Sequence, residues 1–175
     1  GYRRKDSTVK QLLSITHEIY KAFDKSHEID AVFLDISRAF DRVWHEGLIF
    51  KLKRIGIEDE VINILTSFLT DRKQRVVIDG TSSEWNSIES GVPQGSILGP
   101  ILFLVYINDL IDVVESEIRI FADDTFIFRL VNPSSTDALN RDLERIAEWA
   151  HQWKMVFNPD ITKQAVEVVF SNKHK

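Results

Sequence analysis

Helical periodicity recurs along much of the chain. Apolar residues at spacings of three and four predict amphipathic helices at 8–25, 48–55, 61–69 and 139–153. Thr8 and Gln11 have the spacing of a capping box at the start of the first helix. Gly56 is suited to end the second helix, because glycine commonly follows the last helical residue.

The predicted strands are shorter. Ala31–Leu34 is a continuous apolar run that ends in Asp35, as expected for a central strand buried on both faces. Asp79-Gly80 predicts a hairpin turn. A second hairpin is predicted where Ala122-Asp123-Asp124 joins two strand-like runs, with two carboxylates at its tip. Besides the first run, strands are predicted at Arg75–Ile78, Ile118–Phe121, Thr125–Phe128 and Val166–Phe170.

One helix is predicted to have no polar face. The segment from Ser96 to about Leu110 is apolar all round, which predicts a buried helix. Pro100 is compatible with that helix only within its first turn. The segments Gly91–Gly95 and Asn132–Ser135 are predicted loops. This mixed order of helices and strands predicts an α+β domain.

Composition narrows the class of protein. The chain has 175 residues, 43% of them hydrophobic, which fits one globular domain. It has no cysteine, which excludes disulfides, cysteine zinc sites and thiol catalysis. The longest apolar run is shorter than the roughly 20 residues that a membrane helix needs. We therefore expect no membrane partner and an intracellular protein, whether nuclear or cytoplasmic, and the start at Gly1 rather than Met suggests a fragment.

Negative charge is concentrated in one part of the chain. The net charge is −5, and the stretch from Asp109 to Ala150 holds ten acidic residues against four basic ones. Solvated helix faces explain residues such as Glu144 and Glu148. The same stretch contains Asp123-Asp124, for which a cation site is the alternative. The overall sign of the charge does not indicate nucleic-acid binding, which usually shows a basic patch.

Three carboxylates stand where apolar strands end. Asp35 closes one strand, and Asp123 and Asp124 stand at the hairpin tip. If the two strands are neighbours, like charges so close together must share protons or bind cations. Oxygen ligands without histidine or cysteine favour Mg²⁺, and paired Mg²⁺ ions are typical of phosphoryl transfer. Ordinary turn chemistry explains Asp123-Asp124 equally well on its own, but it does not explain Asp35.

A family resemblance rests on motifs in a consistent order. Three segments resemble successive motifs of reverse transcriptases, and their sequences are similar to those of the non-LTR (LINE-like) retrotransposon class: Leu34–Asp41, Gly91–Ser96 and Phe121–Asp124. Flanking segments resemble the family before and after these motifs: Gly1–Thr8, Asn158–Lys163 and Val168–Ser171. The resemblance covers nearly the whole chain. It implies an RNA-directed DNA polymerase, a nucleotidyltransferase that uses an RNA template, a DNA primer and a dNTP.

The resemblance also implies roles for individual residues. Asp35, Asp123 and Asp124 would be the catalytic, metal-binding carboxylates for two Mg²⁺ ions, with Asp124 as the second acid of the hairpin. Backbone groups of Ile36, Ser37, Arg38 and Ala39 would receive the dNTP. Phe40 occupies the place of the family's sugar gate, where a bulky ring collides with a 2′-hydroxyl. Without the resemblance, a core aromatic would be the preferred interpretation of Phe40.

Several other positions have two possible interpretations each. Pro93, Gln94 and Gly95 would form the nucleotide-side loop, although a plain turn before a helix capped by Ser96 has the same pattern. Lys163 lies near a family lysine proposed to protonate pyrophosphate, and a solvated lysine is its alternative. The basic residues Arg72, Lys73 and Arg75 would contact a nucleic-acid backbone or belong to a solvated loop.

The resemblance implies a polymerase palm with partial fingers as a single domain fragment over 1–175. The palm would comprise about 28–44 and 91–171, with partial fingers at about 1–27 and 45–90. The thumb and the first finger strands are expected outside this sequence, so the isolated piece is expected to be weak or inactive. Two alternatives remain: a retroelement remnant that only binds nucleic acid or a protein partner, and another palm-type enzyme such as a nucleotide cyclase.

Overall fold

The computed structural model describes residues 7–131, 135–158 and 165–171. The chain forms two compact units. The first combines the segments 1–37 and 109–175, and the second comprises 38–108. This division differs from the expected palm and fingers boundaries because it groups residues 91–108 with the helices that precede them. The palm and fingers assignment therefore stays a prediction.

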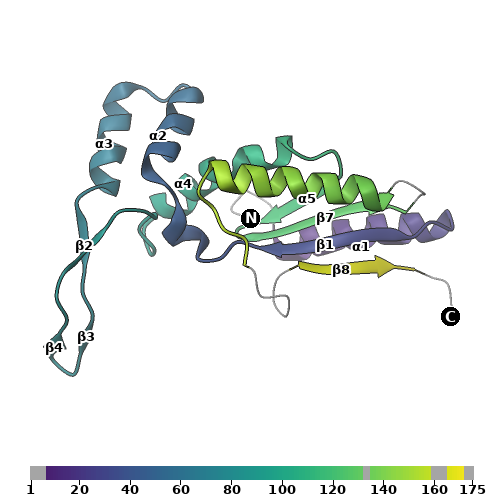
Figure 1. Cartoon of the computed structure of the whole chain (residues 1–175), viewed down its shortest axis with the longest axis horizontal. Coiled ribbons are helices and arrows are strands. Elements are labelled where there is room, and N and C mark those ends of the chain that lie inside the picture. The colour runs from purple at the N-terminus through teal and green to yellow at the C-terminus, as the bar shows by residue number, and fades with distance from the viewer. Residues whose placement is uncertain (1–6, 132–134, 159–164, 172–175) are drawn as a thin grey trace. The chain divides into compact units, whose positions relative to one another are not determined.

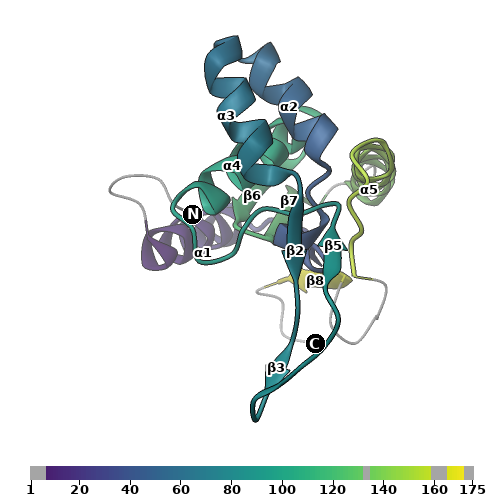
Figure 2. The same cartoon turned by 90° about the vertical axis from the view of Figure 1, so that its left-hand side faces the viewer.

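The first unit is built on a four-stranded sheet in which all paired strands are antiparallel (Figure 1). Its strand order is β6-β7-β1-β8, with bounds β6 Glu117–Phe121, β7 Asp124–Leu130, β1 Ile29–Asp35 and β8 Ala165–Phe170. Two helices, α1 (Thr8–Asp24) and α5 (Ser135–Gln152), lie on opposite faces of this sheet, as Figure 2 shows. β1 is central as predicted, but its apolar run is buried only at Ala31 and Val32, because Phe33 is 42% exposed and Leu34 is half-buried.

The face under α1 has an apolar core. Ala22 of the helix packs with Ala31, Phe126 and Phe128 of the sheet, all of them buried. The face under α5 buries the alternate residues of the same strands, of which Ile127 is fully inaccessible. This alternation follows from the two-residue period of a strand, which sends successive side chains to opposite faces.

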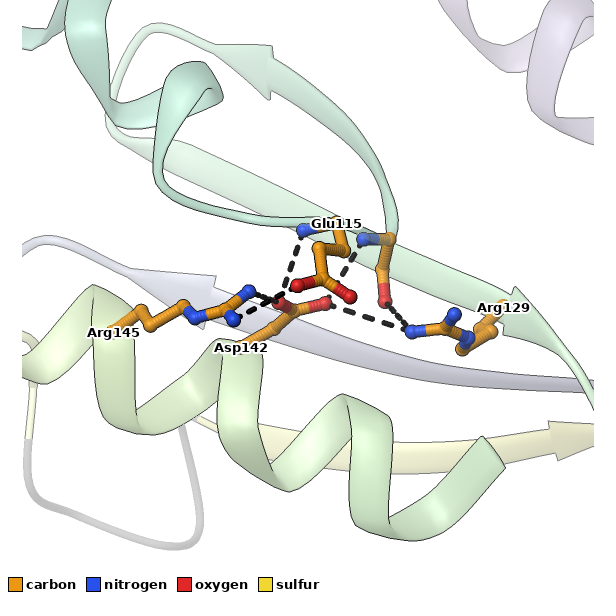
Figure 3. A network of polar contacts seen from close by, with 5 residues as sticks. Glu115, Arg129, Asp142 and Arg145 are labelled. Atoms are coloured by element: carbon orange, nitrogen blue, oxygen red, sulfur yellow. Dashed lines mark hydrogen bonds and ion pairs between the residues drawn. The ribbon is translucent and has the colours of Figure 1, made fainter. Parts of the chain in front are cut away.

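A buried carboxylate ties α5 to the loop before β6 (Figure 3). The Asp142 side chain is only 1% exposed and accepts hydrogen bonds from the backbone N–H groups of Glu115 and Ser116 at 3.0 and 2.9 Å. Arg145 and Arg129 lie 3.2 and 4.0 Å from its two oxygens. The charge of Asp142 is therefore compensated by donors from two separate parts of the chain.

The second unit contains three helices and a long hairpin. The helices are α2 (His45–Arg54), α3 (Asp59–Leu69) and α4 (Leu98–Ile107), and a short 3-10 helix, η1, spans Ala39–Arg42. The hairpin pairs β2 (Arg72–Gln74) with β5 (Asn86–Ile88) and β3 (Val77–Ile78) with β4 (Thr81–Ser82). It extends away from α2 and α3 (Figure 1), and a second 3-10 helix, η2 (Asn108–Asp112), follows α4.

Two local predictions are wrong. The first helix is capped by Ser7 rather than Thr8, because the Ser7 hydroxyl accepts the hydrogen bond of the Lys10 N–H. α4 is not buried all round, since Leu98 and Ile101 are 37% and 52% exposed. The sequence of a helix without a polar face does not show which face will be buried. The buried face is set by the contacts that the helix makes in the fold. Among the described residues, no helix is long and apolar enough to cross a membrane.

The α+β fold class with an antiparallel sheet is confirmed. The predicted carboxylate hairpin is also confirmed as β6 and β7. Asp79 and Gly80 both have positive φ, 48° and 78°, as a two-residue hairpin turn requires.

Candidate active site

The ends of β1 and β7 bring the predicted carboxylates together. Asp35 is the register partner of Asp124, at the last paired position of both strands. Directly opposite residues of an antiparallel pair send their side chains to the same face of the sheet. One position further on, the Ile36 N–H donates a 3.3 Å hydrogen bond to the carbonyl of Asp123. The hairpin tip is therefore attached to the end of β1, as the neighbouring-strand hypothesis required.

The turn itself contains an unusual backbone conformation. Phe121 and Asp124 are the last register pair of the hairpin, so only Ala122 and Asp123 lie between them. Ala122 has φ of 55°, in the left-handed region where a residue with a Cβ is strained. Such strain commonly persists where a functional site needs one side-chain direction. Here the strained residue directly precedes Asp123.

The charges of the three carboxylates influence one another. The pKa of Asp124 is raised, first by partial burial and then by the negative charges of Asp123 and Asp35. The two carboxylates thus lie near enough to oppose ionisation of the third. A bound cation would relieve this repulsion.

This set of donors fits a magnesium site that is completed by a substrate. In the described part of the chain, no group of three or more His, Cys, Asp or Glu side chains is arranged to hold a metal by itself. Mg²⁺ usually takes only one or two carboxylates from the protein and fills its shell with water and substrate phosphates. Asp35 and the Asp123-Asp124 pair supply oxygen ligands of that kind.

A cavity lies beside the carboxylates within the first unit. Its volume is about 390 Å³, and both Asp35 and Asp124 contribute to its wall. The remainder is largely apolar, including Leu12 and Ile15 of α1 and Phe33 and Phe126 of the sheet, whose rings lie 4.5 Å apart. An apolar wall beside charged groups lowers the local dielectric and strengthens their interactions with a cation.

Asn158 is a site neighbour that the sequence analysis did not identify as such. Its backbone N–H donates to the Asp35 carbonyl at 2.9 Å, and its side-chain amide lies 3.5 Å from the Asp35 carboxylate. Ser37 N–H bonds to the carbonyl of Val156, so the segment after α5 runs beside the end of β1. The position of Asn158 at the start of the motif after the hairpin was the only available signal.

The residues expected on the nucleotide side lie mostly in the second unit. Phe40 is half-buried, and its ring stacks on that of Phe103 with centroids 4.6 Å apart. The loop that contains Pro93 and Gln94 is joined to the same region, because Val92 N–H donates to the carbonyl of Phe40 at 2.8 Å. The structure thus brings Phe40 and the loop together.

The remaining predicted residues have different settings. Ile36 is buried, Ser37 is half-buried and Arg38 is exposed with φ of 50°. The Ser96 hydroxyl accepts from the Gly99 N–H at 2.9 Å, although the residue directly before α4 is Ile97, which provides no side-chain cap. Lys163 lies outside the described residues. Ala39 is buried, and Gly95 is exposed with φ of 80°.

Arg72 does not belong to a solvated loop, and its contact with a nucleic-acid backbone stays a prediction. Its guanidinium donates to the carbonyls of Leu69, Ser90 and Gly91, and desolvation lowers its pKa. Because these are contacts within the protein, Arg72 anchors the base of the hairpin to the loop before Pro93. By contrast, Arg75 lies over the exposed Trp85 ring at 4.6 Å.

Comparison with known proteins identifies the family of the chain. The family described as "Reverse transcriptase (RNA-dependent DNA polymerase)" matches residues 1–170. The chain is 34% identical over 98% of its length to the RNA-directed DNA polymerase from mobile element jockey of Drosophila funebris. It is 36% identical over 93% of its length to the probable RNA-directed DNA polymerase from transposon BS of Drosophila melanogaster. The matched region is 19% of each relative, so the chain spans about a fifth of their length.

Solved structures show the same fold. Apo telomerase from Candida tropicalis, truncated from its C-terminal domain, superposes with a TM-score of 0.70 at 16% identity, over 94% of this chain and 35% of that one. Telomerase of the same organism in complex with a fragment of telomeric RNA gives 0.68 at 17% identity, over 97% and 31%. With the family match over residues 1–170 and the carboxylates at the ends of β1 and β7, the chain belongs to the reverse transcriptase family.

Proposed function

We propose that this chain is the part of an RNA-directed DNA polymerase of a non-LTR mobile element that carries the catalytic carboxylates. The reaction joins a dNTP to a primer 3′-hydroxyl and releases pyrophosphate. The observation that carries the proposal is the register of Asp35 opposite Asp124, with the Asp123 carbonyl bonded to Ile36. That arrangement sets acids from two separate family motifs at the same end of the two central strands of the sheet.

The three acids have distinct proposed roles. Asp35 and Asp123 would bind two Mg²⁺ ions. Asp124, the second acid of the hairpin, would add negative charge beside them. Bound Mg²⁺ would activate the primer hydroxyl and stabilise the charge that develops on the phosphates. Asn158 orients Asp35 through its backbone and side-chain N–H groups. The raised pKa of Asp124, caused first by burial and then by the charges of Asp123 and Asp35, supports this assignment, because a cation would relieve the repulsive part.

The proposed nucleotide contacts come mainly from two segments, residues 36–40 and 93–95. Backbone groups of Ile36, Ser37, Arg38 and Ala39 receive the triphosphate where the chain leaves β1. Phe40 excludes ribonucleotides by contact with a 2′-hydroxyl, and its stack on Phe103 supports a rigid gate. The remaining proposed contacts are the loop residues Pro93, Gln94 and Gly95, together with Lys163 as general acid for pyrophosphate.

The macromolecular partners follow from the same proposal. The substrates are an RNA template and a DNA primer, and the site of action is intracellular. The telomerase that superposes on this chain was solved with a fragment of telomeric RNA, which supports an RNA partner. Membership of the reverse transcriptase family argues against the nucleotide cyclase alternative.

Primer extension tests the proposal. The protein that contains this chain is incubated with an RNA template, an annealed DNA primer, dNTPs and Mg²⁺. Asp123→Asn is expected to reduce incorporation on the order of 10²–10³-fold or more, because it removes charge from the reacting phosphates. The matched control is Asp112→Asn, an exposed acid of the same unit, which should retain activity.

The remnant alternative predicts a different result. A wild-type protein that binds template and primer but shows no Mg²⁺-dependent incorporation would favour a binding function and contradict the proposal. The isolated 175-residue chain is expected to be weakly active or inactive by itself. Processive synthesis by the isolated chain would contradict that expectation alone.

A further inference from the structure

Asp41 receives contacts from two residues of the loop that contains Gln94. The Ser90 hydroxyl donates a 2.8 Å hydrogen bond to the backbone carbonyl of Asp41. The Gln94 side-chain amide donates a second bond, also of 2.8 Å, to the Asp41 carboxylate. All three residues lie in the second unit. The loop is therefore bonded to both the backbone and the side chain of a single residue.

The backbones of the two segments also approach each other closely. Gly91 has φ of 85°, and a Cβ on it would lie 2.7 Å from the Asp41 Cα. Only glycine permits this approach. Hydrogen bonds of 2.8 Å on either side of Asp41, from Gly91 N–H to Val43 and from Val92 N–H to Phe40, set the register. The loop thus rests on residues 40–43 in one defined position.

The chemistry of the Asp41–Gln94 contact determines how the amide is oriented. An ionised carboxylate only accepts hydrogen bonds, so the NH₂ group of Gln94 must face it. The carbonyl oxygen of the same amide must then point elsewhere. In the part of the chain that the structure describes, that oxygen has no hydrogen-bond partner. Gln94 consequently presents its carbonyl oxygen as an acceptor to anything that binds beside the loop, while Asp41 occupies one of its two amide hydrogens.

We propose that Asp41 is a positioning residue that holds Gln94 so that its carbonyl oxygen accepts a hydrogen bond from the incoming nucleotide. The inference rests on the proposed polymerase function and assigns to Asp41 a task that no motif comparison gave it. Asp41 itself touches no substrate in this account. Its effect on nucleotide binding passes entirely through the orientation of the Gln94 amide.

Exchange of donor and acceptor tests this relationship. Gln94→Glu places two carboxylates in contact and should raise the KM for dNTP well above that of wild type. Asp41→Asn in the same protein supplies an N–H donor to the new carboxylate at position 94, whose second oxygen remains available to the nucleotide. The double variant should therefore have a KM for dNTP at least about threefold lower than that of Gln94→Glu alone. This factor is at the lower end of the range for one net hydrogen bond.

Single substitutions at Asp41 complete the series. Asp41→Ala removes the acceptor and should raise the KM for dNTP about three- to tenfold with a smaller change in kcat. Asp41→Asn keeps an acceptor and should lie between wild type and Asp41→Ala. Glu60→Ala, at an exposed acid of α3 in the same unit, is the matched control and should leave KM unchanged.

The outcomes separate this inference from the proposed function. If wild type incorporates dNTPs but Asp41→Ala changes only the melting temperature, Asp41 has a structural role and the inference is wrong. A double variant no better than Gln94→Glu would also overturn it. Absence of incorporation by wild type would instead contradict the proposed function, on which the KM measurements depend.

Discussion

Asp35 and Asp124 face each other at the last paired position of β1 and β7. Their strands are the adjacent central pair of the sheet, so two like charges meet at one end of that pair, with Asp123 beside them. The energetic cost of this arrangement is recorded in the raised pKa of Asp124. A site that concentrates negative charge in this way is less stable when empty than when a cation is bound.

Asp124→Asn should make the free protein more stable at neutral pH. Because the folded-state pKa of Asp124 is raised, its ionisation opposes folding above that pKa, and the variant removes this cost. The gain should be below about 1 kcal/mol, since the residue is exposed and screened. It should disappear as the pH falls below the ordinary aspartate pKa of 3.8. Denaturant unfolding of both proteins at pH 7 and in acid measures it, and a loss of stability at pH 7 would refute the repulsion account.

Asp142→Asn should destabilise the first unit at neutral pH. Burial alone would raise the pKa of Asp142, but hydrogen bonds from the Ser116 side chain and from backbone N–H groups, together with Arg145, lower it overall. Its stabilising contribution is therefore complete above the ordinary aspartate pKa and is lost as the pH falls through the lowered value. Unfolding measurements should show a loss of about 2–4 kcal/mol at pH 7. Asp137→Asn, exposed on the same helix, is the control and should change little.

Ala122→Gly should increase stability, contrary to the usual effect of glycine. Ala122 has φ of 55°, and glycine adopts that conformation without a Cβ clash, so a gain of about 0.5–1 kcal/mol is expected. Incorporation should fall, because the turn then restrains Asp123 less. The control is Ala147→Gly, an exposed position within α5, which should cost about 1 kcal/mol. Equal losses of stability at both positions would show that the turn is unstrained.

Phe40→Ala should admit ribonucleotides in a protein that is active on dNTPs. Removal of the ring opens the space that a 2′-hydroxyl needs, and the ratio of kcat/KM for rNTP to that for dNTP should rise on the order of 10- to 100-fold. Phe103→Leu should produce a smaller rise, because it removes the ring against which Phe40 stacks. Phe50→Ala, an exposed aromatic of the same unit, should leave discrimination unchanged. Unaltered sugar selection in Phe40→Ala would exclude a gate at this position.

Local sequence patterns account for most of the helices and strands and for the identity of the acids. Strand and helix periods depend on neighbouring residues, so α1, α3, α5 and the carboxylate hairpin could be predicted. The motif around Asp35 and the one around Asp123-Asp124 likewise indicated the family, because the sequences of these motifs and their order can be read directly from the chain.

Which residues contact each other across the fold depends on tertiary packing. The register that sets Asp35 opposite Asp124 depends on hydrogen bonds between strands that are far apart in the chain. In the same way, Asn158 at Asp35, Asp41 at Gln94 and Arg72 at Gly91 are pairs that no periodicity encodes. Packing also left one side of the apolar α4 exposed. These pairs form through contacts between residues that are far apart in the sequence. A local sequence pattern does not show which distant residue will be in contact.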